Sequence, residues 1–349
     1  MAERIAVIRL GAVGDVVRTL PAVSALRAGY PHARLTWVVE PASAALVEAQ
    51  PWVDEVLVFP RPKLAERLEA REFGPLWSDF RAFVARLRAA RFDLVVDFHS
   101  IMKSGLLALA SGAPLRLGYA RPYGREASWV LANEHARLVP ERCSRFVRNE
   151  ALVEHLGLGV KADPAPLRVP SETTAKMRSQ LGGERPVVLH PGTSDGTPYK
   201  RWTPEGYAKV AAALAERPGV PVLVTAGPAR DDRELAAAIV EASGGAARHA
   251  PETGSLLDLA ALFQESQLYV GSDTGPMHVS SLVGTPVVQI LGPTDPVENR
   301  PFGATPSRSV RVPVACSPCR RGCSAATCIR MVSPDRVIAA ARELLSDRP

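Results

Sequence analysis

IAVIRLGAVGD, residues 5–15, predicts the fold of this chain: a strand, a glycine turn and the start of a helix. Ile5 to Leu10 is an apolar, β-prone run, and Val16 to Ala28 has the apolar spacing of a helix. Pro21 must lie within the first turns of that helix or kink it, because proline has no N–H to donate. Strands that alternate with helices in this way are typical of an α/β domain with a mostly parallel sheet.

The alternation continues along the chain and then starts again. The first series has strand-like runs at 35–39, 56–59 and 94–97, with helical segments at 64–70 and 76–90. A proline-marked stretch at 161–166 follows, which we interpret as a linker between two domains, 1–165 and 166–349. The second series has strands at 187–190, 222–225, 268–270 and 287–291, helices at 204–215, 231–242, 256–264 and 276–283, and a closing helix at 334–345. Ligands in such folds bind outside the carboxyl ends of the strands, so we expect a cleft between the two domains.

The composition is that of an ordinary soluble globular protein. The chain has 349 residues, of which 46% are apolar and 22% charged, and this balance excludes a disordered or fibrous chain. No apolar stretch reaches the roughly 18 residues that span a bilayer, and the N-terminus lacks the long apolar segment of a signal peptide. We therefore expect a cytoplasmic protein.

The net charge of +6 is spread thinly over the sequence. No basic run is interleaved with aromatic residues, so nucleic-acid binding is not expected. A basic face that rests on anionic lipid headgroups stays open as an alternative.

Asp15 ends the first glycine turn, at the carboxyl end of the predicted strand. A carboxylate at this position is either a helix cap or a functional group. Gly11 and Gly14 let the backbone pass close to a ligand, but their spacing is G-x-x-G rather than G-x-G-x-x-G. The latter motif follows none of the predicted strands, which disfavours a nicotinamide or flavin enzyme.

A loop of small and hydroxyl residues follows the first strand of the second series, from His190 to Trp202. Thr193, Ser194 and the backbone of such a loop can donate to phosphate oxygens. Six of the 42 basic residues are lysines, and Lys200 at the exit of this loop is a candidate anion contact or a solvated surface charge. His190 ends the strand and is either a core histidine or a ligand contact.

The segment V-G-S-D-T-G-P-M-H, residues 270–278, joins another strand to a helix. Asp273 or Thr274 could cap the helix that begins near Gly275, and the free N–H groups there would suit a diphosphate. His278, about one turn into the helix, can point to the ligand or under the sheet. G-P-T-D-P at 292–296 is a further loop at the same edge of the sheet, so the sequence predicts a site at this edge.

The sequence has no D-x-D tripeptide to hold a divalent ion against a nucleotide diphosphate, and no G-x-S-x-G elbow. Four cysteines form the pattern C-x2-C-x3-C-x4-C near the end of the chain: Cys316, Cys319, Cys323 and Cys328. They are either structural cysteines or the ligands of a zinc or iron–sulfur site, although the spacing differs from paired C-x2-C knuckles.

Three groups of motifs occur in order: R-L-G-A-V-G-D-V at 9–16, H-P-G-T at 190–193 with K-R-W at 200–202, and S-D-T-G-P-M-H at 272–278 with G-P-T-D at 292–295. Together they resemble glycosyltransferase family nine, the lipopolysaccharide heptosyltransferases. W-V-V-E at 37–40 and K-S at 103–104 also resemble the family, with a lean toward enzymes that add the first heptose. The resemblance covers nearly the whole chain.

The resemblance implies two Rossmann-like domains that face each other across a cleft, the GT-B type of glycosyltransferase. It implies acceptor binding in 1–165 and nucleotide-sugar binding in 166–349, which includes the cysteine-rich segment 316–328 and the closing helix. The implied reaction is an inverting transfer of heptose from ADP-heptose to Kdo-lipid A or to an already heptosylated core. It needs no cofactor for catalysis.

The family also implies residue roles. Asp15 becomes the general base that deprotonates an acceptor hydroxyl, and Lys200 contacts the diphosphate. The implied donor contacts are Gly14, Thr193, Ser194, Asp231, Asp273, Thr274, Gly275 and His278. The implied acceptor contacts are Arg61, Lys63, Lys103 and Arg125. Because the acceptor is anchored in a membrane, we expect peripheral association with the inner face of the cytoplasmic membrane.

Three alternatives stay open from the residues alone. The first is a related transferase that uses a different nucleotide sugar, since the donor motifs suit a diphosphate better than they suit a heptose. The second is a non-catalytic two-domain protein that binds a sugar or nucleotide, for which a base at Asp15 would be unnecessary. The third is a regulatory protein with a metal cluster at Cys316 to Cys328.

Overall fold

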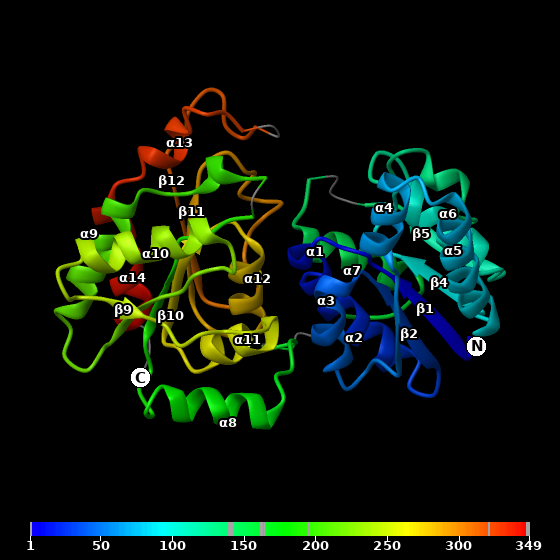
Figure 1. The fold of residues 1–349 in the computed structure, drawn as a ribbon, viewed down its shortest axis with the longest axis horizontal. Coiled ribbons are helices and arrows are strands. Elements are labelled where there is room, and N and C mark those ends of the chain that lie inside the picture. Colours follow the sequence, from blue (N-terminus) through cyan, green and yellow to red (C-terminus); the bar gives the residue numbers. More distant parts are fainter. Residues whose placement is uncertain are drawn as a thin grey trace. The chain divides into compact units, whose positions relative to one another are not determined.

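The computed structural model describes residues 2–138, 142–160, 163, 165–194, 196–319 and 322–346. The chain divides into two compact units, Met1–Ala162 and Asp163–Pro349. Of the linker expected at 161–166, residues 161, 162 and 164 lie outside the described residues. Each unit is an α/β structure with its own sheet and its own helices (Figure 1).

The first unit contains a six-stranded parallel sheet in the order β3-β2-β1-β4-β5-β6. The strands are β1 (Arg4–Ile8), β2 (Arg34–Val39), β3 (Glu55–Val58), β4 (Leu94–Asp97), β5 (Leu115–Tyr119) and β6 (Glu134–Ala136). The helices are α1 (Val13–Val17), α2 (Leu20–Gly29), α3 (Pro41–Glu48), α4 (Arg61–Glu69), α5 (Phe73–Ala89), α6 (Met102–Ala110) and α7 (Arg145–His155), with a 3₁₀ turn η1 (Ser128–Val130).

The second unit repeats this plan with the sheet order β12-β11-β10-β7-β8-β9, again parallel. The strands are β7 (Val187–His190), β8 (Val222–Val224), β9 (Arg248–His249), β10 (Leu268–Ser272), β11 (Val287–Leu291) and β12 (Ser307–Arg311). The helices are α8 (Ser171–Gln180), α9 (Pro204–Ala215), α10 (Arg230–Ala242), α11 (Leu256–Gln264), α12 (Gly275–Leu282), α13 (Thr327–Arg330) and α14 (Pro334–Ser346), with a 3₁₀ turn η2 (Pro198–Lys200).

Both sheets have the Rossmann strand order, in which the first strand lies at the centre. The chain builds outward on one side of β1 to β3, then crosses back to place β4 on the other side; β7 to β10 do the same. Ile8 of β1 pairs with Asp97 of β4, and His190 of β7 pairs with Gly271 of β10. The loops that follow these paired strands run in opposite directions, which leaves the crevice where such folds bind ligands.

The predicted α/β class with two Rossmann-like sheets is confirmed. The helix expected from Val16 to Ala28 is two helices, because α1 ends at Val17 and α2 begins at Leu20. Pro21 lies in the first turn of α2, where a missing N–H costs no helical hydrogen bond. The proline therefore starts a helix rather than kinking one.

Buried aromatic rings fix the loop that carries Lys200. Trp202 is fully buried in the second unit, packs edge-on against Tyr207 at 5.0 Å between ring centroids, and donates its indole N–H to the carbonyl of Val332 over 3.1 Å. Gly206 in the first turn of α9 leaves room for the Trp202 ring, since a Cβ there would lie 2.6 Å from it. The loop is thus anchored in the core two residues after Lys200.

Candidate active site

Asp15 lies in α1, directly beyond the carboxyl end of β1, and it does not cap the helix. The N-cap is Ala12, and no side chain makes a capping hydrogen bond there. Instead the carboxylate contacts three guanidinium groups. Arg9 Nη2 lies 2.5 Å from Oδ2, Arg145 Nη1 lies 3.0 Å from Oδ1, and Arg18 also donates to Oδ1.

These three arginines control the charge of Asp15. Burial raises the pKa of its carboxyl, but the charges of Arg9, Arg18 and Arg145, with the hydrogen bond from Arg145, outweigh burial and hold the pKa well below its ordinary value. Asp15 is therefore firmly ionised in this arrangement. A carboxylate held in this way accepts a proton poorly until a positive charge leaves it.

Arg9 connects the two central loops of the first sheet. Its Nη1 donates to the carbonyl of Phe98 over 2.7 Å, just beyond β4, while Nη2 binds Asp15 beyond β1. His99 follows, and burial together with the charge of Arg9 lowers the pKa of its imidazole to about 3. His99 is therefore neutral at physiological pH.

The predicted acceptor residues do not all gather in one place. Lys103 and Arg61 both bind Glu40, at 2.9 and 3.2 Å, and so form one cluster. The charges of Arg125 and Lys103 both act on His99 and lower its pKa. Lys63 binds Asp79 of α5 at 2.9 Å and belongs to a different ion-pair group, with Arg67.

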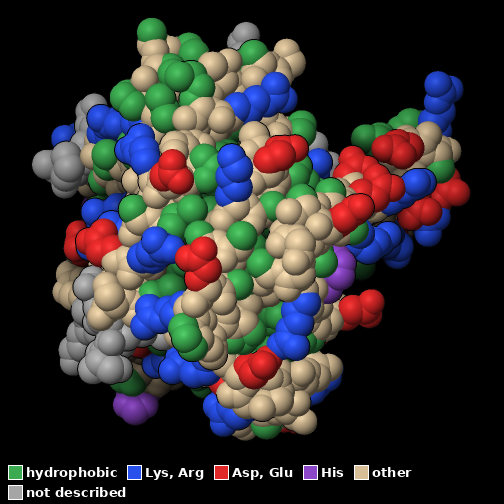
Figure 2. Space-filling view, turned by 90° about the vertical axis from the view of Figure 1, so that its left-hand side faces the viewer, with side chains coloured by type: hydrophobic (Ala, Val, Ile, Leu, Met, Phe, Trp, Pro, Cys, Tyr) green, Lys and Arg blue, Asp and Glu red, His purple; other side chains and the backbone are tan. Residues whose placement is uncertain are grey.

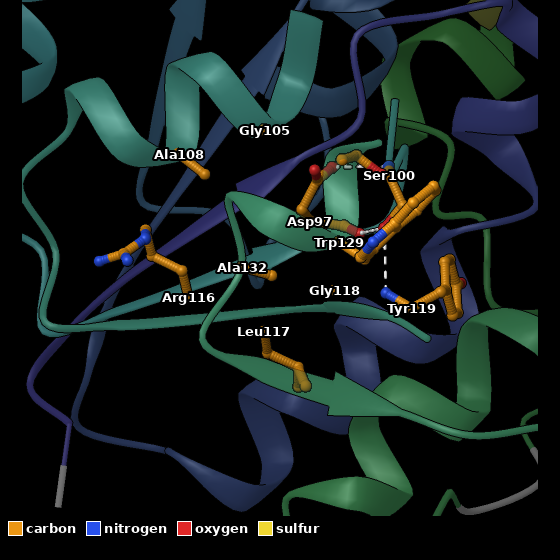
Figure 3. Close-up of a pocket in the computed structure, with 11 residues that line it drawn as sticks. Asp97, Ser100, Gly105, Ala108, Arg116, Leu117, Gly118, Tyr119, Trp129 and Ala132 are labelled. Carbon is orange, nitrogen blue, oxygen red and sulfur yellow. Dashed lines mark hydrogen bonds between the residues drawn. The ribbon is translucent and has the colours of Figure 1, made fainter. Parts of the chain in front are cut away.

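Asp97 closes the carboxyl end of β4 and is almost completely buried. Its carboxylate accepts hydrogen bonds from the backbone N–H groups of His99 and Ser100 and from the hydroxyl of Ser104. Burial nevertheless raises its pKa to about 6. Asp97 and Ser100 line a cavity (Figure 3). Its volume of about 10 Å³ has room for one water molecule and none for a sugar. Asp97 therefore belongs to the scaffold under the site.

In the second unit, Lys200 and Asp273 join the loops beyond β7 and β10. Lys200 Nζ lies 3.1 Å from Asp273 Oδ2 and 3.3 Å from its backbone oxygen. Asp273 is 6% exposed and Lys200 20%. The structure thus brings two predicted donor residues together at the central crevice of the second sheet.

His278 completes this cluster. Its Nε2 lies 3.5 Å from Asp273 Oδ1, and the side chain is buried under the loop. Thr274 is the N-cap of α12 and Gly275 its first residue, so the amino end of α12 begins directly after Asp273. The backbone N–H of Gly275 is one of the hydrogen-bond donors at this end of the helix, whereas Pro276 has no N–H.

A second charged pair lies beside the Thr193 loop. Arg201 binds Asp232 at 2.9 Å and donates from Nε to the hydroxyl of Thr193 over 3.2 Å. Asp232 is buried against Gly192 and Gly227, whose absent side chains make room for its carboxylate. Asp231, the candidate chosen from the sequence, is exposed in the first turn of α10.

Two further residues of this loop, His190 and Ser194, make side-chain contacts within the protein. His190 is a buried histidine whose Nδ1 lies 2.8 Å from the Thr225 hydroxyl, and burial lowers its pKa to about 4, so it is a neutral core residue. The hydroxyl of Ser194 lies 2.9 Å from the hydroxyl of Thr197.

Gly14, a predicted donor contact in the first unit, accepts a hydrogen bond at its carbonyl from Arg18 Nε over 3.0 Å.

Sequence reasoning missed the partners of the aspartates. Arg18 follows Asp15 by three positions, the helical spacing that brings side chains together, so this pair had a local signal. Arg145 is 130 positions away and carries none. The same holds for Asp232, whose role depends on the chain folding back toward Arg201.

The cysteine segment contacts the loop that follows β11. Cys319 donates its N–H to the carbonyl of Pro293 over 2.7 Å, and the Ser317 hydroxyl donates to that of Gly292 over the same distance. Cys328 is buried, and burial together with Cys319, Cys316 and Cys323 raises its pKa. Within the described part of the chain, no three Cys, His, Asp or Glu side chains are placed to hold a metal ion. Of the two alternatives for these cysteines, structural residues or metal ligands, the described geometry gives no support to the metal.

The surface carries mixed charge. Figure 2 shows Lys and Arg side chains interspersed with Asp and Glu over the face it displays, rather than a continuous basic stripe. None of the helices within the described ranges is long and apolar enough to cross a membrane.

Two α/β units, each with a parallel sheet in the Rossmann strand order, have the architecture of a GT-B glycosyltransferase. The chain belongs to glycosyltransferase family 9 (heptosyltransferase), whose model matches residues 80–329.

The known proteins to which this chain is similar include heptosyltransferases and a further glycosyltransferase of family 9. It is 24% identical to the lipopolysaccharide core heptosyltransferase OpsX of Haemophilus influenzae over 304 residues, which cover 86% of this chain and 82% of that protein. It is 25% identical to lipopolysaccharide heptosyltransferase 1 of Escherichia coli, over 84% of this chain and 89% of the relative. The fold matches a family 9 glycosyl transferase from Veillonella parvula with a TM-score of 0.78 at 23% identity, covering 99% and 98% of the two chains. It also matches E. coli heptosyltransferase WaaC with ADP, with a TM-score of 0.77 at 20% identity, covering 98% and 99%.

The buried Asp97 predicts a pH-dependent stability. Folded Asp97 keeps its proton up to about pH 6, whereas an unfolded aspartate loses it near pH 3.8. The folded state binds more protons in this window, so the free energy of unfolding falls as pH rises through it. Asp97→Asn removes this loss, and the difference in unfolding free energy between variant and wild type should shift in favour of the variant by about 2 kcal/mol from pH 4 to 7.

Urea unfolding at several pH values measures this difference. Asp335→Asn, in an exposed position of α14, is the matched control and should track the wild type. Parallel stability curves for Asp97→Asn and wild type would contradict the raised pKa.

Proposed function

We propose that this protein transfers a heptose from ADP-heptose to the anionic inner core of lipopolysaccharide, with inversion at the anomeric carbon. The observation that supports this most is the pairing of family membership with two charged half-sites, Asp15 among arginines and Lys200 beside the amino end of α12. OpsX of H. influenzae and heptosyltransferase 1 of E. coli, both similar to this chain, are lipopolysaccharide heptosyltransferases. One solved relative, WaaC of E. coli, was studied with ADP-2-deoxy-2-fluoro heptose.

In this proposal the first unit holds the acceptor. Lys103, Arg61 and Arg125 supply positive charge for the acidic sugars of Kdo-lipid A or of a heptosylated core, while Asp15 takes the proton of the attacking hydroxyl. Lys63, which is paired with Asp79, contributes through the wider positive field rather than from the same cluster.

The second unit holds the donor. Lys200 and the amino end of α12 would stabilise the charge of the leaving diphosphate. Thr193, Ser194 and Gly275 would donate further hydrogen bonds to it. Asp273 orients Lys200 and His278 from below. Asp231 and Gly14 stay candidates for the nucleotide, although Asp232 makes the contacts to the Thr193 loop through Arg201.

The reaction balances without a redox partner. The acceptor O–H bond breaks and its proton goes to Asp15, while the acceptor oxygen forms a bond to the anomeric carbon. The bond from that carbon to the diphosphate oxygen breaks, and its electron pair leaves with ADP. Water then takes the proton from Asp15, so no cofactor is consumed in this scheme.

Replacement of the base tests the first half-site. Asp15→Asn should lower turnover by a factor of about 100 or more, because it removes general-base catalysis, while donor binding stays close to normal. Turnover is measured as ADP release in the presence of Kdo-lipid A, and donor binding by calorimetry with ADP.

Asp335→Asn is the control, since Asp335 also lies in the first turn of a helix but is exposed. Near-normal turnover in a folded Asp15→Asn protein would show that Asp15 is not the base.

Metal dependence tests the second half-site. Turnover should be unaffected by EDTA, because the sequence has no D-x-D tripeptide and Lys200 with the end of α12 can balance the leaving charge. Initial rates with and without chelator, then with added magnesium or manganese, measure this. Loss of activity that magnesium or manganese alone restores would contradict the assignment.

We further propose that the protein acts at the cytoplasmic face of the inner membrane, bound at its surface. Helix α4 buries none of its residues, and exposed apolar side chains lie near its end and on α5. Leu68, Phe73 and Trp77 are 56%, 63% and 59% exposed, close in sequence to Arg61 and Lys63. Apolar tips beside basic residues suit the interface of an anionic bilayer.

Vesicle co-sedimentation tests this location. We expect binding to vesicles with anionic lipid that weakens strongly from low to moderate salt, since each basic residue near the surface contributes about 1 kcal/mol. Arg61→Ala with Lys63→Ala, and separately Trp77→Ala, should weaken it further. Arg230→Ala, an 85% exposed arginine of α10, is the control. No binding even at low salt would contradict the proposal.

A further inference from the structure

The three arginines around Asp15 are not equally fixed. Arg9 and Arg18 each have a second anchor, on the carbonyls of Phe98 and Gly14 respectively. Their side chains are 12% and 7% exposed. These two guanidinium groups are therefore part of the scaffold.

Arg145 differs in both respects. Its side chain is 36% exposed, and its hydrogen bond to a described side chain is the 3.0 Å contact from Nη1 to Asp15 Oδ1. Its Nε lies buried, with no hydrogen-bond partner among the described residues. Arg145 begins α7, where the Ser144 side chain caps the helix through Val147 N–H, so the backbone stays fixed while the side chain can turn. Within the described part of the chain, Arg145 thus has one N–H without a hydrogen bond and one carboxylate partner that a second carboxylate could replace, so it is suited to bind a carboxylate of a ligand.

We propose that a carboxylate of the acceptor sugar draws Arg145 away from Asp15, so that the base is released only when the acceptor is bound. This rests on the proposed function. The exchange replaces one arginine–carboxylate pair with another, so it costs little pairing energy. Arg145 is then both a contact for the acid group and a positioning residue for the base.

The exchange couples acceptor recognition to catalysis. While Arg145 stays on Asp15, the carboxylate is a poor base, and a water molecule near the donor is not activated. Once Arg145 leaves, the pKa of Asp15 rises, since an adjacent arginine lowers a carboxyl pKa by about 1–3 units. The acceptor hydroxyl proton then passes to Asp15, and the sugar–diphosphate bond breaks as described above.

The other charged groups near Asp15 do not replace Arg145. Arg9 and Arg18 stay on their carbonyl anchors, and neutral His99 brings no charge. Lys103 and Arg125 add to the positive potential around His99, and Lys103 is already paired with Glu40. Arg145 is therefore the group whose movement changes the basicity of Asp15.

The test compares Kdo-lipid A with the form in which its Kdo carboxyl groups are methyl esters, for wild type, Arg145→Gln and Arg148→Gln. Arg148 lies one turn further along α7 and stacks on Tyr123, which makes it the matched control. Wild type and Arg148→Gln should prefer the free acid by about tenfold or more in kcat, and Arg145→Gln should lose this preference. Hydrolysis of the donor without acceptor should rise several-fold in Arg145→Gln, because Asp15 is no longer held. A purely structural role for Arg145 would lower both acceptors equally and leave hydrolysis unchanged, which would overturn the proposal.

A binding measurement separates this proposal from the proposed function. Asp15 is titrated by carbonyl-detected NMR in the wild type and in Arg145→Gln, with and without free Kdo. A rise in its pKa with Kdo that is absent in Arg145→Gln supports the exchange, even if no transfer is seen. Transfer to neither acceptor would overturn the proposed function, and an unchanged pKa with Kdo bound would overturn the exchange.

Discussion

The pairing of the two central strands in each sheet is the constraint on which the rest of the structure depends. Ile8 lies beside Asp97 in the first sheet, and His190 beside Gly271 in the second. Because the connections after these strands turn in opposite directions, their loops separate and leave space at the carboxyl edge. Every charged cluster described above at the two crevices lies at that edge, so the topology determines where the chemistry can occur.

Each crevice is built around a buried or half-buried aspartate that holds cations in place. Asp15 holds three guanidinium groups, and Asp273 holds Lys200 and lies beside His278. Lys200 is a flexible side chain, and its two contacts with Asp273 fix its position before a ligand arrives. Such preorganisation lowers the cost of stabilising a developing charge. The two units differ in polarity: the first surrounds a carboxylate with positive charge, and the second presents a lysine and the end of α12.

The sequence predicts the central strands and the two-domain plan well, because these strands are buried apolar runs. It also predicts the edge strand β3, but it does not predict β6 and β9, each at an edge of its sheet. β6, with Glu134 and His135, and β9, with Arg248 and His249, are short and partly or fully exposed, so no apolar pattern marks them. Lys200, Asp273 and His278 were predicted as donor residues and lie together at one crevice, while their roles stay predictions. Arg145 and Asp232 could not be predicted, because their contacts depend on how distant segments meet.

One reaction tests the proposed function most directly. The wild-type protein is incubated with ADP-heptose and Kdo-lipid A, ADP release is measured, and the lipid product is identified by mass spectrometry and by the NMR coupling of its new anomeric proton. We expect ADP and heptosylated lipid in equal amounts, with the anomeric configuration inverted. Transfer from a different nucleotide sugar in preference to ADP-heptose, or ADP release without a heptosylated product, would contradict it.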